Sequence, residues 1–238
     1  APLPLDRLNS HGKILERLLS FREKSGGKLP KYFRYETLTL QEELNEHIPH
    51  SPPNPLQTPS EILEAPLPLG LQVSLRGYQK VGVNWLCFLR EKGMGGLLAD
   101  DMGLGKTLQA LCVIQGRTLI VSPTSVIQSW EEQLRKFRPN LTAQVYWGSQ
   151  RELNPDVEVT ITSYGLLRLD PSLLNQTWDC AILDEAQTIK NPDSQMARAA
   201  HQIQAKFRLA LSGTPVENRL QDLWSQFEFI NPGLLGTR

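Results

Sequence analysis

The stretch Gly96-Leu-Leu-Ala-Asp-Asp-Met-Gly-Leu-Gly-Lys-Thr107 decides the fold of this chain. A short apolar run opens it and is typical of a buried strand, two glycines allow a tight turn, and the Leu-Gln-Ala-Leu-Cys pattern that follows is helical. In a strand–loop–helix unit of this kind, backbone N–H groups and the positive helix N-terminus favour a phosphate group. The Lys106 side chain can reach β- and γ-phosphates, and the Thr107 hydroxyl can bind Mg²⁺. The stretch therefore predicts a phosphate-binding loop.

This loop departs from the strict pattern G-x-x-x-x-G-K-[ST] at its first position, where Asp100 stands. A G-x-G-K-T sequence also occurs by chance, so a glycine-rich turn with a surface lysine is a second interpretation of the motif alone. The apolar run before the loop and the helical pattern after it favour the phosphate-binding interpretation.

Outward from this loop, from about Leu71 onward, short apolar runs alternate with helical patterns. Strands are predicted at 96–100, 118–122, 157–162, 180–184 and 208–212, and helices near 77–91, 105–115, 125–137 and 194–205. This alternation predicts an α/β fold, a doubly wound parallel sheet with helices on both faces. Polar residues stand where the predicted strands end: Asp100, Ser122, Thr162, Asp184 and Ser212. Ligands bind at that edge of such a sheet.

A second motif, Asp184-Glu-Ala-Gln187, follows one of these strands. A carboxylate at a strand tip can hold Mg²⁺ directly or through water, as we expect for Asp184. Glu185 can polarise a water for in-line attack on a γ-phosphate. An acidic pair after a strand is by itself more often a helix N-cap or a solvated turn. Together with the phosphate-binding loop, the pair predicts the metal-binding and base half of a nucleoside triphosphatase.

The composition of the chain argues against several other classes of protein. The chain has 238 residues, 40% of them hydrophobic and 21% charged, which argues against wholesale disorder. Lys plus Arg and Asp plus Glu both number 25, so net charge alone predicts no nucleic-acid partner. The three cysteines lack C-x-x-C spacing, which excludes a zinc site built on them and indicates a reducing compartment. No apolar run approaches about 18 residues and no signal peptide is visible, so we expect no membrane span.

Proline and charge set the first 70 residues apart. We expect an N-terminal helical arm at 1–48, a Pro-rich linker at 49–70 and one α/β lobe at 71–238. Residues 7–34 carry eight basic side chains, whereas residues 35–64 carry six glutamates and no Lys or Arg. Such a dipolar arm could contact phosphates, although a pair of solvated helices explains the same pattern.

Seven ordered elements resemble the first RecA-like lobe of Swi/Snf-type ATPases, a branch of the superfamily-two helicases. They are LRGYQ (75–79), LLADDMGLGKTLQ (97–109), LIVSPTSVIQSW (119–130), ITSY (161–164), ILDEAQTIKNP (182–192), LALSGTPVENRL (209–220) and LWSQFEFINPGLLG (223–236). The resemblance covers about residues 71–238 and implies a RecA-like P-loop NTPase fold. The DEAQ spelling resembles prokaryotic members more than chromatin remodellers.

The resemblance implies ATP and Mg²⁺ as cofactors and assigns a role to each matching residue. The catalytic residues would be Lys106, Asp184 and Glu185, with Thr107 and Asp184 on the metal. The nucleotide would contact Tyr78, the adenine-reading Gln79, and Asp101, Met102, Gly103, Leu104, Gly105, Lys106, Thr107 and Leu108. Coupling of the nucleotide state to lobe movement would involve Gln187, Ser212, Gly213 and Thr214. A nucleic-acid backbone would contact Pro123, Thr124, Ser125, Thr162, Ser163 and Tyr164.

Some of these roles have structural alternatives. Tyr78 is as readily explained as a core tyrosine as by packing on the base. Helix capping by Thr124 and Ser125, and strand-end turns at 162–164, explain the last group about as well.

The activity implied is ATP hydrolysis by a translocase on duplex DNA, with RNA as an alternative, in the cytoplasm or, in a eukaryote, the nucleus. The second RecA-like lobe, expected in cis, lies beyond Arg238. Its arginines stabilise the transferred phosphoryl group and are worth about 10³–10⁵ in rate in related NTPases. We therefore expect this chain alone to bind ATP but barely to hydrolyse it.

Two other functional classes compete with this interpretation. A nucleotide kinase or GTPase leaves Gln79 and the Ser-Gly-Thr-Pro segment at 212–215 without a role, and the sequence has no N-K-x-D guanine motif. A non-catalytic scaffold is disfavoured by the intact pairs Lys106–Thr107 and Asp184–Glu185.

Overall fold

The computed structural model of the chain describes residues 62–214 and 220–235. The predicted arm, the predicted linker before residue 62, the charge blocks within them and the segment 215–219 lie outside the described residues. The residues that are described belong to a compact unit that begins at Ile62.

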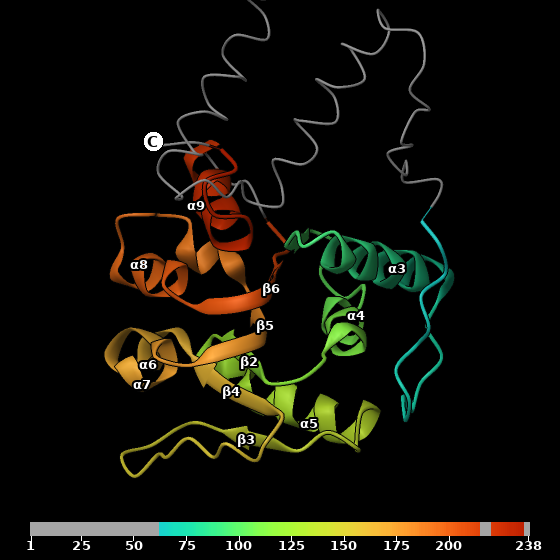
Figure 1. The fold of residues 1–238 in the computed structure, drawn as a ribbon, viewed down its shortest axis with the longest axis horizontal. Coiled ribbons are helices and arrows are strands. Elements are labelled where there is room, and N and C mark those ends of the chain that lie inside the picture. The colour runs from blue at the N-terminus through green and yellow to red at the C-terminus, as the bar shows by residue number, and fades with distance from the viewer. Residues whose placement is uncertain (1–61, 215–219, 236–238) are drawn as a thin grey trace, which may run out of the picture. The chain divides into compact units, whose positions relative to one another are not determined.

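A six-stranded sheet forms the centre of this unit, with its strands in the order β1-β6-β5-β2-β4-β3 (Figure 1). The strands are β1 (Gly96–Leu98), β2 (Thr118–Ser122), β3 (Ala143–Val145), β4 (Val159–Ser163), β5 (Thr177–Leu183) and β6 (Gln204–Leu211). Neighbouring strands pair in parallel throughout. Their carboxyl ends consequently meet at one edge of the sheet, the edge at which the polar residues that follow the predicted strands were expected. The predicted doubly wound α/β fold is confirmed.

Helices cover both faces of the sheet, as Figure 1 shows. One face carries α3 (Gly77–Glu91), α4 (Lys106–Val113) and α5 (Ile127–Phe137). The other carries α6 (Tyr164–Leu169), α7 (Pro171–Leu174), α8 (Gln195–His201) and α9 (Leu220–Ile230). Short 3-10 helices, η2 (Thr124–Val126) and η3 (Ala186–Ile189), follow β2 and β5 closely.

Side chains of the central strands alternate between these two helical layers. In β2, Ile120 packs under α3–α5, whereas its neighbours Leu119 and Val121 pack under α6–α9. Successive side chains of a strand point to opposite faces, so a strand that is buried on both faces is predominantly apolar along its whole length. This is why the strands appear in the sequence as short continuous apolar runs.

The structure differs from the predicted elements mainly at strand β6. The helix predicted at 194–205 ends at His201, and β6 already begins at Gln204. Pairing with β5 explains the difference, because Gln204 stands opposite Thr177 and the strand buries Phe207, Leu209 and Leu211 towards one core. The short elements β3, α6 and α7 had not been predicted, since they contain too few residues to show a period, and the longer helix α9 had not been predicted either.

The segment before α3 lies against this unit. The Ala65 N–H donates to the Asn84 side chain of α3 at 3.0 Å, and the Gln72 N–H donates to the Phe137 carbonyl at 2.9 Å. Residues 62–70, which the sequence assigns to the linker, therefore make fixed contacts with the lobe. The boundary at residue 71 stays a prediction.

The cysteines are buried, free thiols, as expected of core cysteines. Burial raises the pKa of Cys112 to about 11 and that of Cys180 to about 12. Within the described ranges, no helix is long and apolar enough to cross a membrane.

Candidate nucleotide site

The phosphate-binding loop lies between β1 and α4, and two glycines shape it. Gly103 and Gly105 have φ of +82° and +79°, a left-handed conformation that side chains rarely adopt. Gly105 directly precedes the first residue of α4, and a Cβ added at Gly103 would meet nothing within 4 Å. The loop therefore has open space at Gly103 and leads directly into a helix N-terminus, which suits a phosphate.

Lys106 lies within this loop. Its Nζ donates to the main-chain carbonyls of Asp100 at 2.6 Å and of Asp101 at 3.0 Å. Met102 and Leu104 are exposed, whereas Thr107 is half-buried at the start of the helix. The lysine charge is thus held at the mouth of the loop by carbonyls of the loop itself.

Two side chains of α3, Gln79 and Tyr78, donate hydrogen bonds to the loop. Gln79 is buried; its Oε1 accepts from the Arg76 N–H at 2.9 Å and its Nε2 donates to the Leu104 carbonyl at 3.1 Å. Tyr78 donates to the same carbonyl at 3.1 Å and is 42% exposed, so it is not a core tyrosine. The Gln79 amide keeps a second N–H and a second lone pair, which are the groups that adenine recognition requires.

The acidic pair follows β5. The Asp184 Oδ1 accepts from the Glu185 N–H at 3.0 Å, and Oδ2 accepts from the Trp130 indole N–H of α5 at 2.7 Å. Burial raises the pKa of Asp184, although the Trp130 hydrogen bond and the charge of Lys106 act in the opposite direction. Among residues 62–214 and 220–235, Glu185 is the one non-glycine with positive φ, at 50°. Backbone strain of this kind is concentrated at functional sites.

The residues predicted to couple nucleotide state to movement form a hydrogen-bonded chain that begins at Glu185. Gln187 Nε2 donates to Glu185 Oε2 at 2.6 Å, and Ser212 Oγ donates to Gln187 Oε1 at 2.9 Å. The Thr214 N–H in turn donates to Ser212 Oγ at 3.2 Å. A Cβ added at Gly213 would lie 4.0 Å from Lys106 Nζ. The structure therefore brings the phosphate loop, the acidic pair and segment 212–214 together.

The residues predicted to contact nucleic acid separate into two groups. Pro123 is half-buried, and Thr124 and Ser125 are exposed. In the described part of the chain, neither hydroxyl caps a helix, because Val126 is the N-cap of α5 and makes no side-chain cap bond.

Thr162, Ser163 and Tyr164, by contrast, are buried. Thr162 donates to the Tyr146 carbonyl, Ser163 Oγ caps α6 by accepting from the Leu166 N–H, and the Tyr164 hydroxyl donates to the Asp184 carbonyl. Burial raises the pKa of Tyr164 well above its usual range. These side chains therefore fit the alternative of a strand-end turn, and they do not face a ligand.

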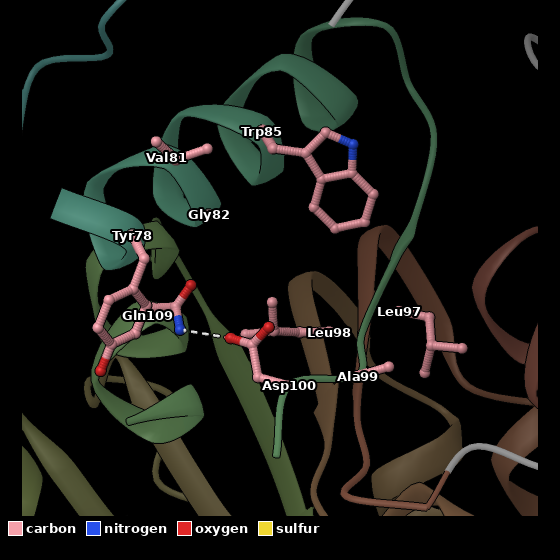
Figure 2. A pocket seen from close by; sticks show the side chains of 9 residues that line it. All are labelled: Tyr78, Val81, Gly82, Trp85, Leu97, Leu98, Ala99, Asp100 and Gln109. Carbon is pink, nitrogen blue, oxygen red and sulfur yellow. Dashed lines mark hydrogen bonds between the residues drawn. The ribbon is translucent and has the colours of Figure 1, made fainter. Parts of the chain in front are cut away.

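Sequence reasoning assigned no role to Gln109, which is fully buried next to the loop. Its Nε2 donates to Asp100 Oδ2 at 2.9 Å, as Figure 2 shows beneath α3. The bond lies beside a cavity of about 450 Å³ lined by Tyr78, Val81, Gly82, Trp85, Leu97, Leu98, Ala99, Asp100 and Gln109. A Cβ at Gly82 would collide with Gln109 Oε1. The spacing from Lys106, one helical turn, was the signal that could have identified it.

The donor set fits a metal ion that binds together with the nucleotide. In the described part of the chain, no group of three or more His, Cys, Asp or Glu side chains could hold a metal. Mg²⁺ is commonly bound by one or two carboxylates together with substrate phosphates, rather than by an all-protein cage. Asp184 and Thr107 are the residues that would supply the protein ligands.

Comparison with known proteins gives a consistent result. The family described as the SNF2-related domain matches residues 78–238. The chain is 45% identical over 181 residues to the putative ATP-dependent helicase/translocase YwqA of Bacillus subtilis, covering 69% of this chain and 20% of that protein. It is 38% identical over 209 residues to the TATA-binding protein-associated factor MOT1 of Saccharomyces cerevisiae, covering 76% and 11%.

A solved structure shares the fold. The SWI2/SNF2 ATPase core of Sulfolobus solfataricus, in complex with dsDNA, is 40% identical with a TM-score of 0.69, over 74% of this chain and 39% of that one. The chain spans a fifth or less of the two curated relatives and about two fifths of this core. The RecA-like fold expected from the resemblance is confirmed, and the relatives include both bacterial and eukaryotic proteins. The chain belongs to the SNF2-related family.

Proposed function

We propose that this chain is the ATP-binding lobe of an ATP-hydrolysing translocase that acts on duplex DNA. The observation that carries the proposal is the junction of Lys106, the Asp184–Glu185 pair and segment 212–214 at one edge of the sheet. The dsDNA in the complex of the Sulfolobus core and the name of the Bacillus relative support the substrate and the type of activity.

Each residue then has a chemical task. The N–H groups of the loop and the Lys106 ammonium bind the phosphates and neutralise their charge. Thr107 and Asp184 would hold Mg²⁺, which supplies further neutralisation of the phosphoryl group when it is bound. Glu185 accepts a proton from the attacking water at its carboxylate. Gln187 orients that carboxylate through the bond to Oε2, which leaves Oε1 available.

The nucleic-acid contact in this proposal uses the exposed Thr124 and Ser125 hydroxyls at the tip of β2. Hydroxyl groups at such positions contact phosphate oxygens and carry no base information. Affinity for DNA should therefore fall steeply with salt and show no preferred sequence. A second RecA-like lobe would complete the site with the arginines that make hydrolysis fast.

Calorimetric binding of Mg²⁺·ATP to the chain tests the nucleotide site. Lys106→Ala should weaken binding about tenfold or more, because one charge no longer faces the phosphates, whereas substitution of the exposed Lys136 of α5, Lys136→Ala, should leave it unchanged. An unchanged affinity for Lys106→Ala would exclude the assignment. The ATPase rate of a protein with both lobes, measured with duplex DNA, RNA and neither, then tests the substrate.

A further inference from the structure

Asp184, which follows β5, receives hydrogen bonds from the segment after the neighbouring strand β2 and from the segment after β4, the next strand beyond β2. The Trp130 indole N–H of α5 donates to its carboxylate Oδ2 at 2.7 Å. The Tyr164 hydroxyl, at the start of α6, donates to its main-chain carbonyl at 2.7 Å. One residue of the catalytic pair is thus held by side chains from two other parts of the chain.

The sheet order explains why these contacts meet at Asp184. Strands β5, β2 and β4 lie next to one another and run in parallel, so their carboxyl ends are adjacent. Asp184 follows β5, the exposed hydroxyls at 124–125 and then α5 follow β2, and α6 follows β4. A ligand bound at the tip of β2 would act on the short helix that leads directly into the turn carrying Trp130.

Both donors are buried, with 1% of Trp130 and 3% of Tyr164 exposed. Neither side chain can therefore contact a nucleic acid that lies on the surface. The indole N–H is the one polar group of the Trp130 side chain, and it is used on the Asp184 carboxylate. These contacts lie between the exposed end of β2 and the proposed nucleotide site, and neither side chain is placed to contact a ligand itself.

We propose that Trp130 and Tyr164 are positioning residues that transmit nucleic-acid binding at the tip of β2 to Asp184. The inference rests on the proposed function, since it needs a DNA-dependent ATPase. When the start of α5 shifts, the indole N–H shifts with it, and the carboxylate that must bind the metal is reoriented. A buried acceptor that loses its donor is costly, so the two sites change together.

Two conservative variants test this route in a protein that carries both lobes. Trp130→Phe removes the indole N–H and keeps a ring in the core, and Tyr164→Phe removes one hydroxyl. Trp178→Phe is the matched control: Trp178 is 1% exposed, lies on β5 and donates its indole N–H to the Leu173 carbonyl at 3.1 Å. Thermal unfolding of all variants checks that each one folds.

The quantity measured is the stimulation ratio, the ATPase rate with saturating duplex DNA divided by the rate without DNA. We expect Trp130→Phe to lower this ratio about tenfold and Tyr164→Phe to lower it less, because Tyr164 bonds the main chain rather than the carboxylate. DNA affinity without nucleotide should stay within about twofold of wild type. Binding gives an independent readout: an ATP analogue with Mg²⁺ should change the DNA affinity of wild type and of Trp178→Phe, but not of Trp130→Phe.

Three outcomes would overturn the inference. Trp130→Phe could keep the wild-type ratio, it could lower the rates with and without DNA equally, or Trp178→Phe could lose as much of the ratio. In each case a DNA-stimulated wild type leaves the proposed function intact. A wild type with no response to any nucleic acid contradicts both proposals together.

Discussion

The phosphate loop and the acidic corner, which we propose bind parts of one ligand, are built in opposite ways. The loop is exposed, depends on two left-handed glycines, and its lysine bonds carbonyls five and six residues away. The acidic corner is half-buried. Asp184 depends on Trp130 of α5 and on Tyr164, and Glu185 depends on Gln187. A short local sequence is therefore enough to build the first, whereas the second requires the assembled sheet.

Removal of the proposed base should have the largest effect. Glu185→Gln keeps the size of the side chain but cannot accept a proton, so kcat should fall about 10²–10⁴-fold in a protein with both lobes. Nucleotide affinity should hold, because the loop carries that binding. Steady-state ATPase assays together with equilibrium binding separate the two quantities. Retained turnover would show that the corner has no catalytic task.

Two alanine substitutions in the loop separate the energetic cost of the left-handed backbone from the cost of a steric contact with Gln79. Gly103→Ala and Gly105→Ala both force a side chain into left-handed φ, at a cost of about 1–2 kcal/mol each. At Gly105 the added Cβ would also lie 2.6 Å from Gln79 Nε2, whereas at Gly103 it meets nothing within 4 Å. We expect Gly105→Ala to lower the free energy of unfolding by about 1 kcal/mol more, measured by urea denaturation. Equal losses would refute a role for Gln79 in supporting the loop.

Two aspartates, Asp170 and Asp184, should respond to pH in opposite directions. Hydrogen bonds from Ser172, Tyr146 and Arg151 lower the pKa of Asp170 from 3.8 to about 2. Its stabilising contribution is therefore present above about pH 4 and is lost as the pH falls through about 2. Asp170→Asn should destabilise the protein by about 1 kcal/mol at neutral pH, with the difference from wild type vanishing in acid.

For Asp184 the sign is reversed, because burial raises its folded-state pKa. The charged form opposes folding at neutral pH, and protonation in acid removes that cost. Asp184→Asn removes this charge but leaves one amide oxygen for the N–H donors of Trp130 and Glu185, so a lost hydrogen bond offsets the gain. Without added Mg²⁺, the stability of the variant relative to wild type should therefore be highest at neutral pH and should fall as the pH drops towards the pKa of Asp184. Urea denaturation across pH 2–8 checks both aspartates, and a relative stability of Asp184→Asn that stays constant or rises in acid contradicts the expectation.

The accuracy of the predicted elements follows the same division between local sequence and the assembled sheet. The helix 77–91 and the strand 118–122 have the predicted bounds, because each has a clear period or a continuous apolar run. Strand β6 was predicted too short and the preceding helix too long, because alanine-rich residues 197–200 do not mark where a helix stops. Pairing with β5 decided that boundary.

The residues of the candidate site could be predicted only where they belong to a short continuous motif. The sequence by itself determined the loop, Lys106 and the Asp184–Glu185 pair, since each stands next to a strand whose apolar run fixes the edge at which it ends. Only the tertiary structure decided that Trp130 bonds a carboxylate 54 residues away and that Tyr164 turns inward. The physical reason is that a parallel sheet brings distant strand ends into contact in an order, β5-β2-β4, that the sequence of the strands does not contain.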